Sequence, residues 1–143
     1  MQARPTMRPY FDAYVLSYKT FSEAFASLLA TELIRSDTSL PDMTSEFGTV
    51  IAQTDSDASA AADAYKIASS NPACPNALTA FLSFRGIHAI QFHRIAQAYW
   101  LAGEKTFAML LQNCCAKSYN VDIHPAARIG KGAAGNTIIE FVA

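Results

Sequence analysis

The first third of the chain places a large apolar residue at every third or fourth position, which is the period of an amphipathic helix. This spacing holds for Phe11, Tyr14, Val15, Tyr18, Phe21, Phe25, Leu28, Leu29 and Leu33. It predicts a first helix over about 8–35, ended by the polar residues Ser36–Ser39. A second, short helix is predicted over about 41–53, because Pro41 suits a first helical turn and an apolar stripe follows it, at Met43, Phe47, Val50 and Ile51.

Alanine dominates the next segment, and proline ends it. Asp55-Ser56-Asp57 offers short carboxylates that can cap a helix N-terminus, so we expect a helix from there to Ser69. Asn71-Pro72 and Cys74-Pro75 disfavour helical backbone and predict an ordered loop over 71–76. Further helices are predicted over about 76–84, 86–102 and 104–119, with Gly103 as the stop between the last two. The pattern therefore predicts one all-α, multi-helix domain over residues 1–119.

After residue 119 the pattern changes to a period of six. Ile123 and Ile129 lie six positions apart, with Pro125 and small residues between them and turn glycines at Gly130 and Gly132. One branched apolar side chain in six residues is typical of a hexapeptide-repeat β-helix, which buries a core only by stacking its coils. The residues from Val121 onward amount to roughly one coil. We therefore expect 120–143 to be a short, truncated start of a left-handed β-helix with a divergent tail.

Several of these segments together resemble the serine acetyltransferases, the acetyl-CoA-dependent enzymes of cysteine biosynthesis. The resemblance covers about 20–132 and is carried by Asn71–Cys74, Phe84–Gln91, His93–Ile95, Leu110–Asn113 and Val121–Gly130. It implies the family's fold, a helical N-terminal domain followed by a left-handed β-helix. It also implies the family's reaction, acetyl transfer from acetyl-CoA to L-serine, with acetyl-CoA as co-substrate and no other bound cofactor.

The resemblance assigns a catalytic role to Asp122. In this family the Asp of the Val-Asp-Ile-His motif orients a catalytic His, which acts as general base on the serine hydroxyl while the alkoxide attacks the thioester. Histidine suits this task because its ordinary pKa lies near the working pH, and a carboxylate behind it fixes the tautomer. The family's base lies about fifteen residues later, where this sequence has Thr137 preceded by Asn136. We therefore expect the chain alone to be inactive.

A second departure from the family lies at Asn71. The family has an aspartate here, in an Asp-Pro-Ala motif, that binds the amino group of the substrate serine. Asn71 keeps the shape but gives up the charge-assisted hydrogen bond, so we expect weak substrate binding. The alternative is that Asn71 only begins a proline turn.

Composition and charge narrow the partners and the compartment. A net charge of −1 with 16% charged residues argues against nucleic-acid binding, which needs clustered Lys and Arg. No apolar run approaches the length of a membrane span. Met1–Pro9 carries two arginines but no apolar stretch of a secretory signal, which leaves an organellar transit segment as the minor alternative to a cytoplasmic location.

Neither the cysteines nor the histidines form a metal or redox motif. Cys114 and Cys115 are adjacent, which is poor geometry for a disulfide, so we expect small buried apolar groups in a reducing compartment. His88 and His93 lie five apart with no Asp or Glu between 64 and 103, so we expect packing or hydrogen-bonding groups and no metal.

The resemblance also implies a homo-oligomer, because the family's helical domains pair catalytic trimers into hexamers. The aromatic stripes of the first and late helices favour such an interface, and we expect a dimer or small oligomer. The alternative function is a non-catalytic short protein that binds the full-length enzyme or O-acetylserine sulfhydrylase. The tail Asn136–Ala143 loosely matches the family's sulfhydrylase-binding tail, although it ends in alanine where the family has isoleucine.

Overall fold

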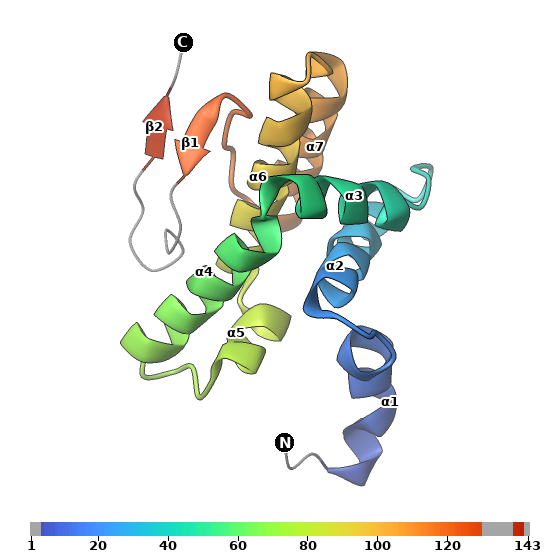
Figure 1. The fold of residues 1–143 in the computed structure, drawn as a ribbon, viewed down its shortest axis with the longest axis vertical. Coiled ribbons are helices and arrows are strands. Elements are labelled where there is room, and N and C mark those ends of the chain that lie inside the picture. The colour runs from blue at the N-terminus through green and yellow to red at the C-terminus, as the bar shows by residue number, and fades with distance from the viewer. Residues whose placement is uncertain (1–3, 130–138, 142–143) are drawn as a thin grey trace.

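The computed structural model of the protein describes residues 4–129 and 139–141, and it is helical up to Tyr119 (Figure 1). Its elements are η1 (Pro5–Met7), α1 (Arg8–Phe11), η2 (Asp12–Leu16, a π-helical turn), α2 (Phe21–Ser36), α3 (Thr44–Thr54), α4 (Ser56–Ser70), α5 (Ala77–Ser83), α6 (Arg85–Leu101), α7 (Lys105–Tyr119), β1 (Ala127–Ile129) and β2 (Ile139–Phe141). The predicted all-α, multi-helix fold class is confirmed.

The prediction of one helix over 8–35 is wrong, because the chain turns between η2 and α2. Thr20 is extended and its hydroxyl accepts a hydrogen bond from the Glu23 amide at 3.2 Å. The Glu23 carboxylate in turn accepts from the Lys19 amide at 3.0 Å. The first bond satisfies an amide that a new helix N-terminus leaves open, and the second fixes the residue before the cap, similar to a capping box. The Thr-x-x-Glu spacing in the sequence is a signal for a helix start. Here it determines where α2 begins, although the apolar period continues through it.

The predicted start of the second helix is wrong, whereas α4 starts where predicted but without a side-chain cap from Asp55. Helix α3 begins at Thr44 and not near Pro41, because the Asp42 carboxylate accepts hydrogen bonds from the Thr44 amide at 2.9 Å and its hydroxyl at 2.6 Å. Asp55 does not cap α4 with its side chain. It adopts a left-handed conformation, φ 51°, that ends α3, which Asp tolerates better than most residues. Asp57 instead joins α4 to α2 by accepting from the Ser22 hydroxyl at 2.7 Å.

The second half of the helical region follows the predictions closely. The loop over 71–76 separates α4 from α5, and α5, α6 and α7 begin and end within two residues of the predicted bounds. Gly103 has φ +89°, and the amides of Gly103 and Glu104 donate to the carbonyls of Trp100 and Tyr99. This left-handed glycine stop is the one predicted between the last two helices.

The main core lies between α2, α3, α6 and α7, and a smaller cluster joins α4, α5 and the start of α6. Phe25, Leu29, Phe47, Ile95 and Leu111 are buried at the centre of the main core. Figure 1 shows α6 and α7 side by side, with α4 crossing toward the lower left and α1 standing apart from the other helices at the lower right. Helix α6 is therefore the element that the others surround.

The C-terminal strands pair with each other. β1 and β2 are antiparallel, with Ala127 opposite Phe141 and Ile129 opposite Ile139. Successive coils of a β-helix run parallel, so this pairing is not a contact between two coils. Gly130 and Gly132 lie outside the described residues. The division into a helical domain over 1–119 and a β-helical start over 120–143 stays a prediction.

Candidate active-site segment

The segment that carries Asp122 leaves α7 through a sharp turn and runs back to β1. Asn120 adopts a left-handed conformation, φ 55°, directly after the last residue of α7. Two residues later, Asp122 is exposed, and its Oδ1 accepts a hydrogen bond from Gln112 Nε2 of α7 at 2.5 Å. One oxygen of the predicted catalytic carboxylate is therefore held by the helical part of the chain.

His124, two residues further on, is held by a different helix. Its ring packs edge-on against Trp100 of α6, with 4.8 Å between ring centroids, and its Nδ1 accepts from the Ala126 amide at 3.0 Å. The Lys105 ammonium lies 4.8 Å from the centre of the Trp100 ring. No hydrogen bond joins Asp122 to His124 among the described residues, so these two side chains do not form a dyad.

The backbone at the start of β1 is fixed by two more side chains of α6. His93 Nε2 lies 2.7 Å and Gln97 Nε2 2.9 Å from the Ala127 carbonyl oxygen. Because a carbonyl only accepts, His93 must carry its proton on Nε2. Its Nδ1 is buried and has no hydrogen-bond partner among the described residues. Burial lowers the pKa of His93 to about 4, so the ring is neutral at pH 7.

The prediction that the two histidines serve as hydrogen-bonding groups is confirmed, although the sequence does not indicate what His93 binds. His88 Nε2 lies 2.6 Å from the Phe81 carbonyl oxygen, and burial lowers its pKa. Residues 93, 97 and 100 are four and three apart, so they share one face of α6. This spacing in the sequence indicates a face of α6 on which another segment of the chain can pack. Among the described residues, no group of three His, Cys, Asp or Glu side chains could hold a metal ion.

Asn71 lies in the loop between α4 and α5. Its Oδ1 accepts from the Ala73 amide at 2.9 Å, and its backbone carbonyl accepts from the Cys74 amide at 3.0 Å. These contacts are those of a residue that opens a proline turn, the alternative to substrate binding. In Figure 1 this loop lies at the lower end of α4, well away from β1. Within one copy, the described structure does not bring the predicted substrate residue to the segment of Asp122.

The cysteines are buried, as predicted for Cys114 and Cys115. Burial raises the pKa of Cys115 to about 12, and its Sγ lies 3.7 Å from the Ala89 carbonyl oxygen. A thiol that stays protonated is a poor nucleophile and a poor metal ligand. The Cys115 side chain therefore contributes mainly packing between α7 and α6.

A buried ion pair links α4 to α6. Arg94 Nη1 donates to Asp63 Oδ2 at 2.5 Å and to Gln91 Oε1 at 2.8 Å, and Gln91 Nε2 donates to Asp63 Oδ2 at 2.7 Å. Sequence spacing does not predict this network, because Asp63 and Arg94 lie 31 residues apart on different helices. The network holds in place the helix that carries His93 and Gln97.

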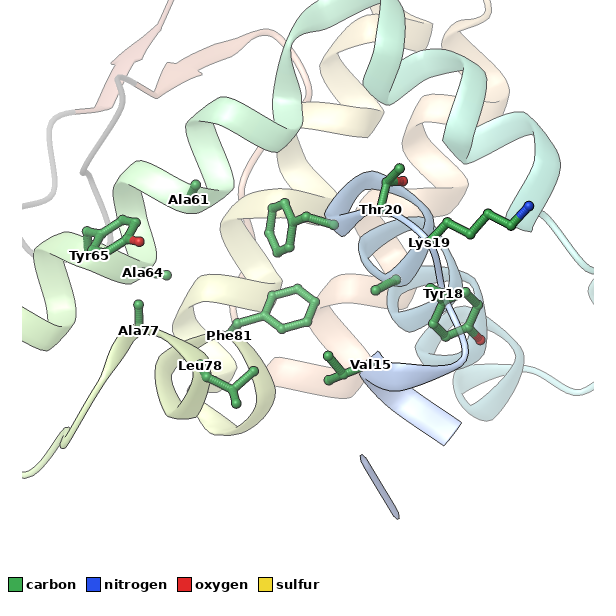
Figure 2. Close-up of a pocket in the computed structure, with 12 residues that line it drawn as sticks. Val15, Tyr18, Lys19, Thr20, Ala61, Ala64, Tyr65, Ala77, Leu78 and Phe81 are labelled. Atoms are coloured by element: carbon green, nitrogen blue, oxygen red, sulfur yellow. The ribbon is translucent and has the colours of Figure 1, made fainter. Parts of the chain in front are cut away.

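An apolar cavity lies at the start of α2, and no residue of the segment that carries Asp122 lines it. It has a volume of about 500 Å³ and lies between the start of α2, α4 and α5 (Figure 2), lined mainly by Val15, Tyr18, Phe21, Tyr65, Leu78 and Phe81. Lys19 is its charged residue, and Figure 2 shows that side chain pointing away from the cavity. Most of the lining side chains are apolar, and the polar ones are those of Tyr18, Lys19, Thr20 and Tyr65.

Comparison with known proteins finds relatives over most of this chain. The family model "Serine acetyltransferase, N-terminal" matches residues 1–92. A putative serine acetyltransferase of Schizosaccharomyces pombe is 44% identical over 120 residues, which cover 82% of this chain and 44% of that protein.

Solved structures show the same fold. The Neisseria gonorrhoeae serine acetyltransferase superposes with a TM-score of 0.80 at 31% identity and covers 90% of this chain and 50% of its own. A serine acetyltransferase in complex with CoA gives a TM-score of 0.84 at 30% identity, covering 90% of this chain and 55% of its own.

The chain thus spans about half the length of the relatives that it matches. None of its described helices is long and apolar enough to cross a membrane. By the family match over its first two thirds and by its relatives, the chain belongs to the serine acetyltransferase family.

Proposed function

We propose that this protein serves acetyl transfer from acetyl-CoA to the hydroxyl of L-serine, the acyltransferase step of cysteine biosynthesis. The family match over residues 1–92, together with the Val121–His124 motif further along the chain, is the observation that carries the proposal. Solved relatives hold CoA in one case and serine in another, which supports acetyl-CoA and serine as the two substrates.

Within that reaction, this chain supplies the helical part and the carboxylate, not the base. Asp122 would orient a histidine that takes the proton of the serine hydroxyl, and the carboxylate would stabilise the imidazolium that results. Thr137, where the family has its base, lies outside the described residues. The proposal therefore assigns the chain a role as the helical oligomerisation domain with the first residues of a hexapeptide-repeat β-helix.

A chimera tests the catalytic part of the proposal. Residues 1–129 would replace the matching half of the Escherichia coli serine acetyltransferase, a relative 31% identical over 131 residues. We expect serine-dependent release of CoA, reduced about a hundredfold or more by Asp122→Ala, the scale of general acid–base effects. Asp37→Ala, which removes an exposed carboxylate from the loop after α2, is the control and should keep the rate. A folded, oligomeric chimera without turnover would contradict the proposal.

The chain alone provides the complementary experiment. Without the family's base it should release no CoA above background when given serine and acetyl-CoA. Turnover that Asp122→Ala abolishes would mean that a base is present after all.

Association through the helices is proposed from exposed apolar side chains near the N-terminus. Met7, Tyr10, Leu16 and Phe21 are all at least 36% exposed, whereas Phe25, Phe92 and Tyr99 of the predicted stripes are buried in the core. Symmetric pairing of copies is the usual way to cover such a surface. The exposed residues Met7, Tyr10, Leu16 and Phe21 are therefore available to an interface, whereas the buried aromatic residues are not.

Sedimentation equilibrium at micromolar concentration measures this association. We expect a dimer or small oligomer that weakens in the double variant Met7→Ser, Leu16→Ser. Leu101→Ser, which removes an exposed leucine from the end of α6, is the matched control. A strict monomer of 15.5 kDa across the concentration range would overturn the proposal.

The remaining partner and location proposals rest on the sequence. We propose a cytoplasmic protein without nucleic-acid partners; the net charge of −1 and the buried free cysteines Cys74, Cys114 and Cys115 support this. A contact of Asn136–Ala143 with O-acetylserine sulfhydrylase is the second partner proposal; apart from the backbone of β2, this tail lies outside the described residues. Deleting 136–143 should abolish co-purification with the sulfhydrylase if the tail is the contact.

A further inference from the structure

Two helices, α7 and α6, hold the segment that carries the Asp122 carboxylate. Gln112 of α7 holds its Oδ1 at 2.5 Å. Five residues later, His93 and Gln97 of α6 hold the Ala127 carbonyl oxygen at 2.7 and 2.9 Å. Between these two points the segment has no regular secondary structure, so side chains and not a ladder of backbone bonds fix its course.

The Gln112 amide has only one sensible orientation. Its Oε1 is buried and has no hydrogen-bond partner among the described residues, while its Nε2 donates to Asp122. Exchanging the two atoms would place an amide oxygen against a carboxylate oxygen, and both only accept. The side chain thus leaves a buried acceptor unsatisfied while it keeps its bond to the carboxylate. Violations of this kind are expected at functional sites.

The hydrogen bond from Gln112 engages only one of the two oxygens of the Asp122 carboxylate. Asp122 Oδ2 makes no hydrogen bond among the described residues, and the side chain is exposed. A carboxylate with one oxygen fixed and the other open can accept from an imidazole N–H in a single orientation. We propose that Gln112 is a positioning residue for the Asp122 carboxylate, with His93 and Gln97 holding the following backbone in register.

This inference rests on the proposed function for its catalytic meaning, but its test needs no catalysis. Gln112→Met keeps the side-chain length and removes the donor, whereas Gln112→Lys keeps a donor of similar reach. Asn113→Met, at an exposed neighbour on α7, is the matched control. The measurement is the χ1 angle of Asp122 in the isotopically labelled 143-residue chain, from three-bond couplings between the side-chain carboxyl carbon and the backbone.

We expect a single χ1 rotamer for Asp122 in the native chain, in Gln112→Lys and in Asn113→Met, and averaged couplings in Gln112→Met. Exchange of backbone amides in 121–127 should rise about threefold to tenfold in Gln112→Met, with α2 and α3 unchanged. Near-UV circular dichroism confirms that each variant is folded.

Averaged couplings in the native chain, or one rotamer in Gln112→Met, would overturn the inference. In the chimera, Gln112→Met should lower kcat about tenfold with KM for serine unchanged, because Gln112 contacts the carboxylate and no substrate. An inactive chimera combined with a fixed rotamer would refute the proposed function and leave the positioning contact standing.

Discussion

Helix α6 and the N-terminal segment Pro5–Leu16 both mix aromatic, aliphatic and charged residues, yet they place them in opposite environments. α6 buries His88, Gln91, His93 and Arg94 along with its apolar residues. The N-terminal segment buries none of its residues and exposes Met7, Tyr10 and Leu16. Each buried polar side chain of α6 has a partner on another element, whereas the N-terminal segment bonds mainly to itself. Partners across the fold, and not residue type, decide burial here.

The largest effect is expected when the buried ion pair of α6 is broken. Arg94→Met leaves the Asp63 carboxylate buried without its guanidinium, which should cost about 3–5 kcal/mol of unfolding free energy. Urea denaturation measures the loss. Arg35→Met, at an exposed arginine that contacts Glu32 and Tyr14, is the control and should cost less than about 1 kcal/mol.

A double variant sharpens this result. Adding Asp63→Leu to Arg94→Met removes the buried charge that the single variant leaves behind, so it should recover part of the lost stability. If the double variant is as unstable as the sum of the two single ones, packing and not charge would explain the effect.

The second prediction uses the other buried polar group of α6. Burial holds the pKa of His93 near 4, below its ordinary 6.5, so below about pH 6.5 the unfolded chain takes up a proton that the folded chain does not. Stability must therefore fall as the pH falls from about 6.5 to 4, by about 3 kcal/mol from this group.

His93→Gln keeps a donor for the Ala127 carbonyl and removes the titration. The fall in unfolding free energy between pH 7 and pH 4 should be about 3 kcal/mol smaller in this variant than in the native chain. Urea titrations at each pH measure both chains. Identical pH profiles would show that His93 titrates as it does in water.

Local signals in the sequence predict α5, α6 and α7 well, because each of these helices has a proline, cap or glycine at its end. The left-handed Gly103 is the clearest example. The helices in the first half of the chain are predicted less well. An apolar period runs unbroken from Phe11 to Leu33 and predicts one helix. The capping pair Thr20 and Glu23 instead starts a new helix after a turn. Here the apolar period, which is averaged over many residues, conceals the capping signal, which only Thr20 and Glu23 carry.

The candidate site shows a different limit. Its Asp122 was found from a motif, but Gln112, His93 and Gln97 were not assigned to it, because their partners are Asp122 and one backbone carbonyl, 10 to 34 residues away. Periodicity places residues on a helix face but does not name what the face will meet. Asp63 was missed as the partner of Arg94 for the same reason.

A smaller effect is expected where α6 ends. Gly103 has φ +89°, so Gly103→Ala forces a side chain into a left-handed conformation and should cost about 1 kcal/mol. Gly86→Ala, in the first turn of the same helix with open space around it, should instead stabilise the protein by about 0.5–1 kcal/mol. Thermal unfolding of the two variants should therefore shift in opposite directions.

The smallest effect is expected for the ion pair of the N-terminal segment. Arg8 and Asp12 lie 2.8 Å apart, almost as close as Arg94 and Asp63, but their side chains are 70% and 47% exposed, compared with 9% and 0%. Water screens the exposed pair, so Arg8→Gln should change the unfolding free energy by less than about 0.5 kcal/mol in urea denaturation. A loss approaching that of Arg94→Met would mean that the Arg8–Asp12 pair itself is shielded from water in solution. Two Arg–Asp pairs of similar length thus separate the effect of burial from that of distance.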